Sequence, residues 1–332
     1  MNRNETPIDS LVASEESAPV AKHFEAVRHE LSRVLVGQSE LVEALAIALI
    51  CNQHVLIEGV PGVAKTLTVR ALGDIMGLSF QRIQFTPDLL PSDLVGTQIF
   101  HPQSGEFSVR KGPVFANLVL ADEINRAPAK VQSALLESME ERQVTLGDTS
   151  FPLPTPFMVL ATQNPIEQEG TYPLPEAQLD RFMFKVHVDY PGRDEELAIL
   201  RLKRAATPLL SKALDAASLA ELSRAAESVH LEERLEEYIV DLVRATRDPA
   251  AYGLDLGPAI RFGAGPRAIG FFLKASQARA LLCGRDFVLP ADVHYVAPLI
   301  LRHRILLSWE ALAEGLTADT VVARILEGVS AP

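Results

Sequence analysis

The chain has 332 residues, of which 48% are hydrophobic, so it can fill the core of one large domain or two ordinary ones. Its 31 basic and 43 acidic residues give a net charge of −12, which opposes nonspecific binding to nucleic acid. Its two cysteines, Cys51 and Cys283, form no C-x-x-C motif and no cluster with histidines, which argues against disulfides and structural zinc and favours a reducing, cytoplasmic compartment.

Residues 1–20 are polar and acidic without an apolar signal core, and we expect a disordered tail there. From Ala21 to Cys51, apolar residues recur at helical spacing with a break at Val36-Gly37-Gln38, which predicts two helices and a tight turn. The most apolar run, Leu41 to Cys51, is about half the roughly 20 residues that a membrane span needs, so we expect a buried helix. The turn is either an ordinary helix break or, because it precedes the phosphate loop, a base-binding turn formed by Val36 and Gly37.

A phosphate loop follows the apolar run from His54 to Glu58. The loop reads Gly59-Val60-Pro61-Gly62-Val63-Ala64-Lys65-Thr66. The run has the length of a buried strand and the pattern predicts a helix from Thr66, so the free amides of the turn can bind an anion. Lys65 can reach terminal phosphates and Thr66 can hold Mg²⁺, which predicts a nucleoside triphosphate site that Leu67 completes. Ala64 departs from the generic G-x-x-x-x-G-K-[ST] pattern, and alanine is favourable there if the residue is helical.

An insertion, about residues 86–112, separates the strand predicted at Ser79 to Phe85 from the next core strand. It starts with a loop from Thr86 to Gly96. A hairpin is predicted next, with strands at Thr97 to Phe100 and Gly105 to Val109. Long insertions in compact domains are more often functional than idle, although a solvated decoration is the alternative.

Paired carboxylates end the apolar strand that begins at Leu118. Asp122 and Glu123 would lie at the carboxyl edge of a parallel strand. There Asp122 can bind the Mg²⁺ hydration shell, while Glu123 polarises the attacking water. The combination with a phosphate loop favours this interpretation over a strand that simply enters a charged loop.

Further elements follow up to the predicted domain boundary at Pro191-Gly192. The pattern predicts an amphipathic helix at Ala129 to Glu141, a hairpin at residues 144–153, a strand at Phe157 to Thr162 and a strand at Met183 to Asp189. Asn164 follows the first of these strands, where its amide can hold a water against the γ-phosphate or merely start a turn.

The pattern from Arg193 to Pro332 is helical throughout. Arg267 opens a helix from Ala268 to Leu282, and an arginine at a helix start opposes the dipole unless an anionic ligand is near. The run from Pro298 to Leu307, which contains two arginines and a histidine, is interpreted as helix surface.

The chain resembles the MoxR family of AAA+ ATPases from about Ala21 to the C-terminal helices. The segments that carry the resemblance are Gly59 to Thr66, Leu120 to Pro128, Ala161 to Pro165, Leu174 to Phe182 and Gly265 to Ala268. The resemblance implies an α/β class AAA+ core of five parallel strands sandwiched by helices over residues 21–190, followed by an all-helical lid over residues 191–332. It also implies that both inserts face the pore of a ring.

The resemblance assigns roles to three residues. Asn164 would be the sensor-1 residue and Arg267 the sensor-2 residue of the lid. Arg181 would be the arginine finger that reaches the γ-phosphate of a neighbouring subunit, with Arg126 as the alternative because it lies close behind Asp122 and Glu123.

Three functions are compatible with these features. The first is a Mg²⁺-dependent ATPase that forms a homo-oligomer, such as a hexameric ring, and acts as a chaperone that remodels partners or inserts a metal cofactor; in the family such partners are often proteins with von Willebrand factor A domains. The second is a nucleotide-gated regulatory scaffold with slow hydrolysis. The third, a nucleic-acid motor, is disfavoured by the charge.

Overall fold

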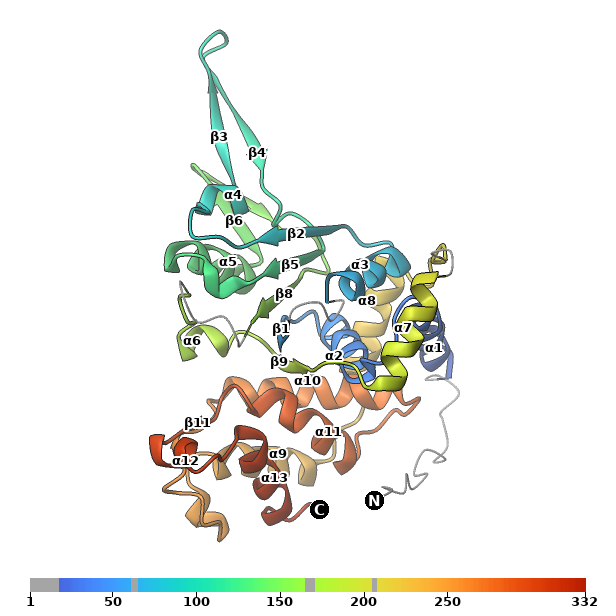
Figure 1. Ribbon diagram of the computed structural model, residues 1–332, viewed down its shortest axis with the longest axis vertical. Helices are drawn as coiled ribbons and strands as arrows, with labels where there is room; N and C mark the ends of the chain where they lie inside the picture. Colours follow the sequence, from blue (N-terminus) through green and yellow to red (C-terminus); the bar gives the residue numbers. More distant parts are fainter. Residues whose placement is uncertain (1–17, 61–64, 165–170, 205–207) are drawn as a thin grey trace.

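The computed structural model describes residues 18–60, 65–164, 171–204 and 208–332, with an α/β part above a helical part (Figure 1). Five strands form the central sheet in the order β2-β5-β8-β1-β9, and every pair is parallel. They are β1 (Val55–Gly59), β2 (Phe80–Gln84), β5 (Leu118–Asp122), β8 (Met158–Gln163) and β9 (Phe184–Val188). The predicted parallel core is confirmed.

Helices cover the sheet and build the part beneath it. Those up to the predicted boundary are α1 (Ala18–Ser32), α2 (Ser39–Ile50), α3 (Lys65–Met76), α4 (Pro91–Val95), α5 (Ala129–Glu141), α6 (Glu176–Leu179) and, just beyond it, α7 (Arg193–Arg204). The lower part, which we call the lid, contains α9 (Glu233–Ala245), α10 (Arg267–Leu282), α11 (Pro290–Leu301), α12 (Trp309–Ala313) and α13 (Ala318–Gly328). Helix α8 (Ala216–Glu227) packs against α2 and against α10 of the lid. Short 3-10 turns lie at η1 (Ile124–Arg126) and η2 (Pro249–Tyr252). No described helix has the length and apolar character needed to cross a bilayer.

The N-terminal tail was predicted to end at residue 20. Helix α1 begins at Ala18, so residues 18–20 are helical, and the first 17 residues lie outside the described part.

Successive residues of the central strands face opposite sides of the sheet. Leu118 and Leu120 pack into one hydrophobic core, whereas Val119 and Ala121 pack into the other, which contains the apolar residues of α5. This alternation is that of a strand buried on both faces. The first core continues from α1, α2 and α3 into the lid helices, so lid and sheet share buried apolar surface, and a domain division at residue 191 remains a prediction.

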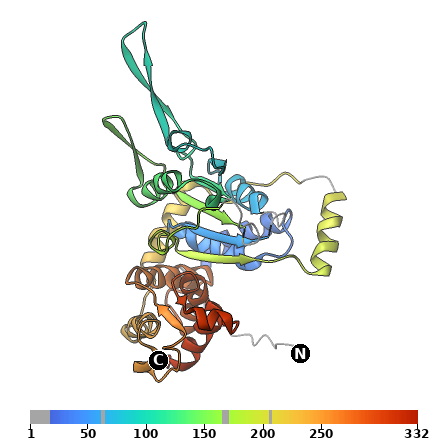
Figure 2. The ribbon, with the colours of Figure 1, turned by 60° about the vertical axis from the view of Figure 1, so that its left-hand side comes forward.

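Two antiparallel hairpins project from the α/β part (Figure 2). They are β3 (Gly96–His101) with β4 (Glu106–Lys111) and β6 (Gln143–Leu146) with β7 (Thr149–Pro152), close to the predicted positions. The loop predicted before the first hairpin contains α4. Near the tip of the β3–β4 hairpin, the rings of Phe100 and Phe107 contact each other with centroids 5.1 Å apart, although the two residues are 51% and 65% exposed.

Two predictions for the C-terminal part are wrong. It is not helical throughout, because β10 (Ile260–Phe262) pairs antiparallel with β11 (Leu306–Leu307). The run from Pro298 to Leu307 is not helix surface, since α11 ends at Leu301 and Arg304 is buried. Carbonyl groups of Phe182 and Met183, directly before β9, and the Asp180 carboxylate satisfy the Arg304 guanidinium, which is why a cation in this run can lie inside.

Candidate nucleotide site and arginine cluster

The predicted site residues meet at the carboxyl edge of the sheet. β1 ends at Gly59, β5 ends at Asp122, and β8, which pairs with both strands, ends directly before Asn164. Asn164 is 9% exposed at this edge. The parallel arrangement therefore places the start of the phosphate loop, the acid pair and the candidate sensor together.

Lys65 reaches back across the loop to the end of β1. Its Nζ donates a hydrogen bond to the Gly59 carbonyl oxygen at 2.6 Å. Burial lowers the pKa of Lys65, while the nearby charges of Asp122 and Glu123 raise it. A Cβ on Gly59 would lie 2.3 Å from the Val188 carbonyl oxygen, so the strand ends pack too closely for any side chain there. The rest of the predicted loop, Pro61, Gly62, Val63 and Ala64, lies outside the described residues.

Asp122 is held through both oxygens of its carboxylate. Arg82 pairs with Oδ2 at 2.6 Å, and the Thr162 hydroxyl donates to Oδ1 at 2.6 Å. The described residues contain no cluster of three His, Cys, Asp or Glu side chains that could hold a metal by itself. The Asp122 carboxylate and the Thr66 hydroxyl are nevertheless hard oxygen ligands of the kind Mg²⁺ takes beside substrate phosphates, so these residues fit that ion.

Glu123 has a left-handed backbone with φ of 57°. Its carboxylate accepts a hydrogen bond from the Gln84 amide at 2.8 Å and pairs with Arg126 at 3.1 Å. Its backbone N–H donates to the Thr162 hydroxyl at 2.9 Å. A left-handed non-glycine residue is uncommon and concentrates at functional sites.

Three of these partners, Arg82, Gln84 and Thr162, were not predicted. The order of strands in the sheet was the missing information: β2 places Gln84 opposite Asp122, and β8 places Thr162 beside it.

A cavity of about 660 Å³ lies beside the start of α3. Val36 and Leu67, both predicted to bind the nucleotide, line it. Gly37 has φ of +69°, and a Cβ there would lie 2.3 Å from a carboxylate oxygen of Glu195. Further lining residues that the sequence did not indicate come from the segment after β9, including Tyr190 and Pro191, and from α7, including Ile199 and Leu202. The mainly apolar lining next to a phosphate loop suits a nucleoside.

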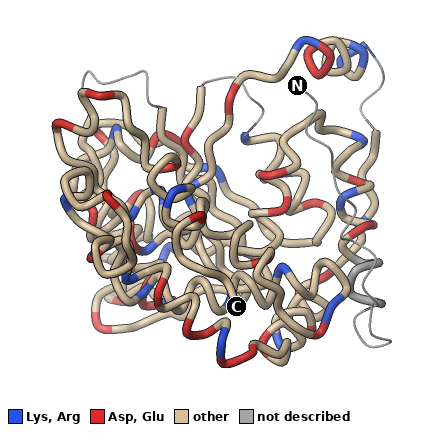
Figure 3. Tube along the Cα trace, turned by 90° about the horizontal axis from the view of Figure 1, so that it is seen from below, with Lys and Arg blue, Asp and Glu red and all other residues tan. Residues whose placement is uncertain are grey.

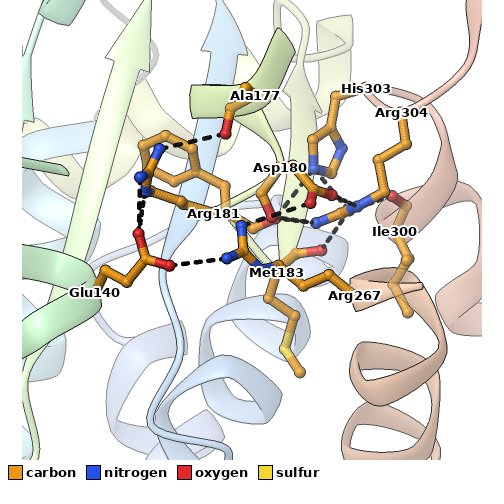
Figure 4. Close-up of polar contacts among 10 residues, drawn as sticks. Glu140, Ala177, Asp180, Arg181, Met183, Arg267, Ile300, His303 and Arg304 are labelled. Atoms are coloured by element: carbon orange, nitrogen blue, oxygen red, sulfur yellow. Dashed lines mark hydrogen bonds and ion pairs between the residues drawn. The ribbon is translucent and has the colours of Figure 1, made fainter. Parts of the chain in front are cut away.

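Arg181, the predicted arginine finger, and Arg267, the predicted sensor-2 residue of the lid, both pair with the carboxylate of Glu140 (Figure 4). Arg181 pairs with Glu140 at 2.7 Å, and Arg267 pairs with the other Glu140 oxygen at 2.9 Å. The hydrogen bond from Arg181 is the main cause that lowers the Glu140 pKa. Arg267 also lies 3.5 Å from Asp180, the residue before Arg181. The structure therefore brings Arg267 to Arg181, while the alternative finger, Arg126, pairs with Glu123 of its own chain.

The arginine cluster and the cavity lie on opposite sides of the molecule. In Figures 1 and 2, α6, which precedes Arg181, is on one side and α7, which lines the cavity, is on the other. Seen from the lid end, acidic and basic residues are interspersed along the described chain (Figure 3). That view shows no continuous basic track of the kind that follows a nucleic-acid backbone.

Two family comparisons match the parts of the chain that carry these residues. The ATPase family associated with various cellular activities (AAA) matches residues 54–184. The AAA lid domain matches residues 255–325. The first range includes Lys65, the acid pair and Arg181, and the second includes Arg267.

Individual relatives extend the similarity over most of the chain. Chaperone MoxR1 of Mycobacterium tuberculosis is 48% identical over 304 residues, which cover 91% of this chain and 81% of that protein. The uncharacterised Bacillus subtilis protein YeaC is 46% identical over 92% of this chain and 94% of its own length. Protein MoxR of Paracoccus denitrificans is 34% identical over 86% of this chain and 89% of its own. A crystal structure from Cytophaga hutchinsonii, provisionally assigned as an ATPase, matches with a TM-score of 0.90 and 48% identity over 96% of this chain and 97% of that one.

Proposed function

Because this chain belongs to the MoxR family of AAA+ ATPases, we propose that it hydrolyses ATP in a Mg²⁺-dependent reaction that drives chaperone-like remodelling of partner proteins. The observation that carries the proposal is the convergence of Lys65, Asp122 and Glu123 at one sheet edge beside a cavity of about 660 Å³. A phosphate-binding lysine, a metal-binding carboxylate and a base next to a nucleoside-sized cavity are the parts that phosphoryl transfer to water requires.

Each residue has a distinct task in this mechanism. The backbone from Gly59 to Ala64 and the Lys65 ammonium bind the phosphates, and Thr66 with Asp122 would hold the ion. Bound Mg²⁺ offsets charge that develops on the phosphate oxygens. Glu123 orients the attacking water and accepts its proton, and Asn164 fixes that water.

We infer that Arg181 acts on the nucleotide of a neighbouring subunit. The helix that precedes it, α6, lies across the molecule from α7, which lines the cavity, and contacts between two different faces of successive subunits generate rings. Since Arg267 shares Glu140 with Arg181, we propose that both arginines approach the neighbour's γ-phosphate together. An arginine supplied in this way accelerates phosphoryl transfer by about 10³ to 10⁵.

The test is the ATPase rate per chain as a function of protein concentration, with mass determined by light scattering with and without ATP. We expect the specific activity to rise steeply as the ring forms, and Glu123→Gln to bind ATP but turn over about 10² to 10⁴ times more slowly. A monomer as active per chain as any oligomer would contradict the in-trans arginine. An unchanged rate in Glu123→Gln would contradict the assignment of the base.

We propose that the ring is hexameric and that the two hairpins contact its clients. The hairpins project from the α/β part, and the exposed Phe100 and Phe107 pair offers an apolar contact for a client chain. Proteins with von Willebrand factor A domains, and complexes that receive a metal cofactor, are the proposed client classes.

A nucleotide-gated scaffold is the second candidate function, and one observation favours it. Gln84 and Arg126 both engage the Glu123 carboxylate, and a base held in this way is consistent with slow hydrolysis. The discriminating experiment asks whether the Glu123→Gln variant still supports the cellular task. A scaffold should keep its function in this variant, whereas a remodeller that depends on hydrolysis should lose it.

A further inference from the structure

Arg304 connects the lid to the segment that carries Arg181. It lies in the turn after α11, with 2% of its side chain exposed. Its Nε pairs with Asp180 Oδ1 at 2.8 Å. The remaining guanidinium nitrogens donate to the carbonyl oxygens of Asp180 at 3.0 Å, Phe182 at 2.6 Å and Met183 at 3.2 Å, and to that of Ile300 one turn back.

These contacts lie on both sides of Arg181 in the chain. Arg304 holds the residue before Arg181 and the two residues after it, while the Arg181 side chain itself extends to Glu140 and the Ala177 carbonyl (Figure 4). The backbone position of Arg181 is therefore set by a lid residue 123 positions later in the sequence. A rigid planar guanidinium suits this task because it presents several donors in fixed directions.

Asp180 also links Arg304 to the lid arginine at the site. Its Oδ1 faces Arg304, and its Oδ2 lies 3.5 Å from Arg267. One carboxylate between two lid arginines ties this segment to the lid at two points.

We propose that Arg304 is a positioning residue for Arg181, which it fixes to the lid through Asp180 so that the orientation of the lid sets where Arg181 enters the neighbouring active site. This inference rests on the proposed action of Arg181 in trans. A merely stabilising buried ion pair is the competing explanation, so the experiment needs a readout other than stability.

The first variant is Arg304→Lys, which keeps a positive charge beside Asp180 but replaces the fork with one ammonium. We expect kcat to fall by about 10- to 100-fold because the finger is misplaced. The KM for ATP should stay within about twofold because nucleotide contacts are intact. Arg302→Lys is the matched control, since Arg302 lies in the same turn but binds Asp319 at 2.9 Å and the Lys185 carbonyl, and it should turn over normally.

The decisive measurement mixes Arg304→Lys with Glu123→Gln in equal amounts. Each chain supplies what the other lacks. The Arg304→Lys chain keeps Glu123 in its active site, and the Glu123→Gln chain donates a well-placed Arg181 to that site. For random, independent subunits the mixture should recover about a quarter of the wild-type rate, as should Arg181→Ala mixed with Glu123→Gln.

Recovery with Arg181→Ala but not with Arg304→Lys would overturn the positioning role and leave the proposed function intact. Recovery in neither mixture would overturn the in-trans finger and the inference together. If Arg304→Lys fails to fold, Asp180→Asn takes its place, because asparagine keeps the side-chain shape and removes the charge. This variant is mixed with Glu123→Gln in the same way, and the two outcomes are interpreted as above.

Discussion

The side-chain amide of Gln84 donates a hydrogen bond to the Glu123 carboxylate at 2.8 Å. Gln84 is the last residue of β2 and lies opposite Asp122 in the parallel register, so the residue after Asp122 comes within reach of the amide. Arg126 binds the same carboxylate from the following turn. The proposed base must exchange these partners for water before it can act.

Removing the Gln84 amide should therefore increase basal turnover. We expect Gln84→Leu to raise the ATPase rate without client by about 2- to 10-fold, because a hydrogen bond of this kind contributes about 0.5 to 1.5 kcal/mol. The measurement is steady-state phosphate release at saturating ATP. Gln81→Leu makes the same change at another exposed position of β2 and should leave the rate unchanged. A slower Gln84→Leu enzyme would show instead that the amide assists the base.

The two candidate arginine fingers differ in their contacts, so their variants should differ in rate. Arg181→Ala should lower kcat by about 10³-fold or more, as expected for an arginine that stabilises transition-state charge. Arg126 pairs with Glu123 of its own chain, and Arg126→Ala should change kcat by less than about tenfold. Single-turnover rates of assembled rings provide the measurement. The reverse order of effects would identify Arg126 as the finger.

The centre of the candidate site was predictable because its geometry is local. The phosphate loop and the acid pair directly follow apolar runs, and the carboxyl ends of parallel strands share one edge. The hairpins were predictable for a similar reason, since each is closed by a short turn that contains glycine or polar residues.

The partners of these residues were not predictable because they depend on strand order and on distant packing. Gln84 reaches Glu123 only because β2 lies next to β5. Arg304 and Asp180 are 124 positions apart in the sequence. Nothing in the sequence near Arg304 indicates that its side chain is buried and donates to carbonyl groups of a distant segment. Arg267 was assigned to the phosphates by resemblance, and only the structure shows that it shares Glu140 with Arg181.

Gly37 should matter for nucleotide binding as well as for backbone conformation. Gly37→Ala forces a left-handed alanine and places a Cβ where the Glu195 carboxylate now lies, so this side chain, which lines the cavity, must move. Gly253→Ala is a matched control, because Gly253 has φ of +70° with no atom within 4 Å of its Cβ position. Both variants should lose about 1 to 2 kcal/mol of unfolding free energy. Only Gly37→Ala should weaken ATP binding in a calorimetric titration, and equal affinity in both variants would separate this turn from the nucleotide site.

His54 should make the protein sensitive to mild acid. Its ring is buried between β1 and β8, where Nδ1 accepts the Val159 N–H at 3.0 Å and Nε2 lies 3.2 Å from the Met139 carbonyl oxygen. Burial, followed by the charge of Arg142, lowers the pKa of His54 to about 3.

The unfolded chain takes up a proton at this histidine below pH 6.5, whereas the folded chain does so only near pH 3. The free energy of unfolding therefore starts to fall at about pH 6.5 and continues to fall as the pH is lowered towards 3. Each pH unit in this window costs about 1.4 kcal/mol. Between pH 7 and pH 5, urea unfolding should show a loss about 2 kcal/mol larger in the parent protein than in His54→Gln. His101→Gln, a substitution on the exposed β3–β4 hairpin, should keep the parent's full loss, because it leaves the buried ring in place. Equal losses in the parent and in His54→Gln would mean that water reaches His54 in the folded protein, since only a hydrated imidazole titrates alike in both states.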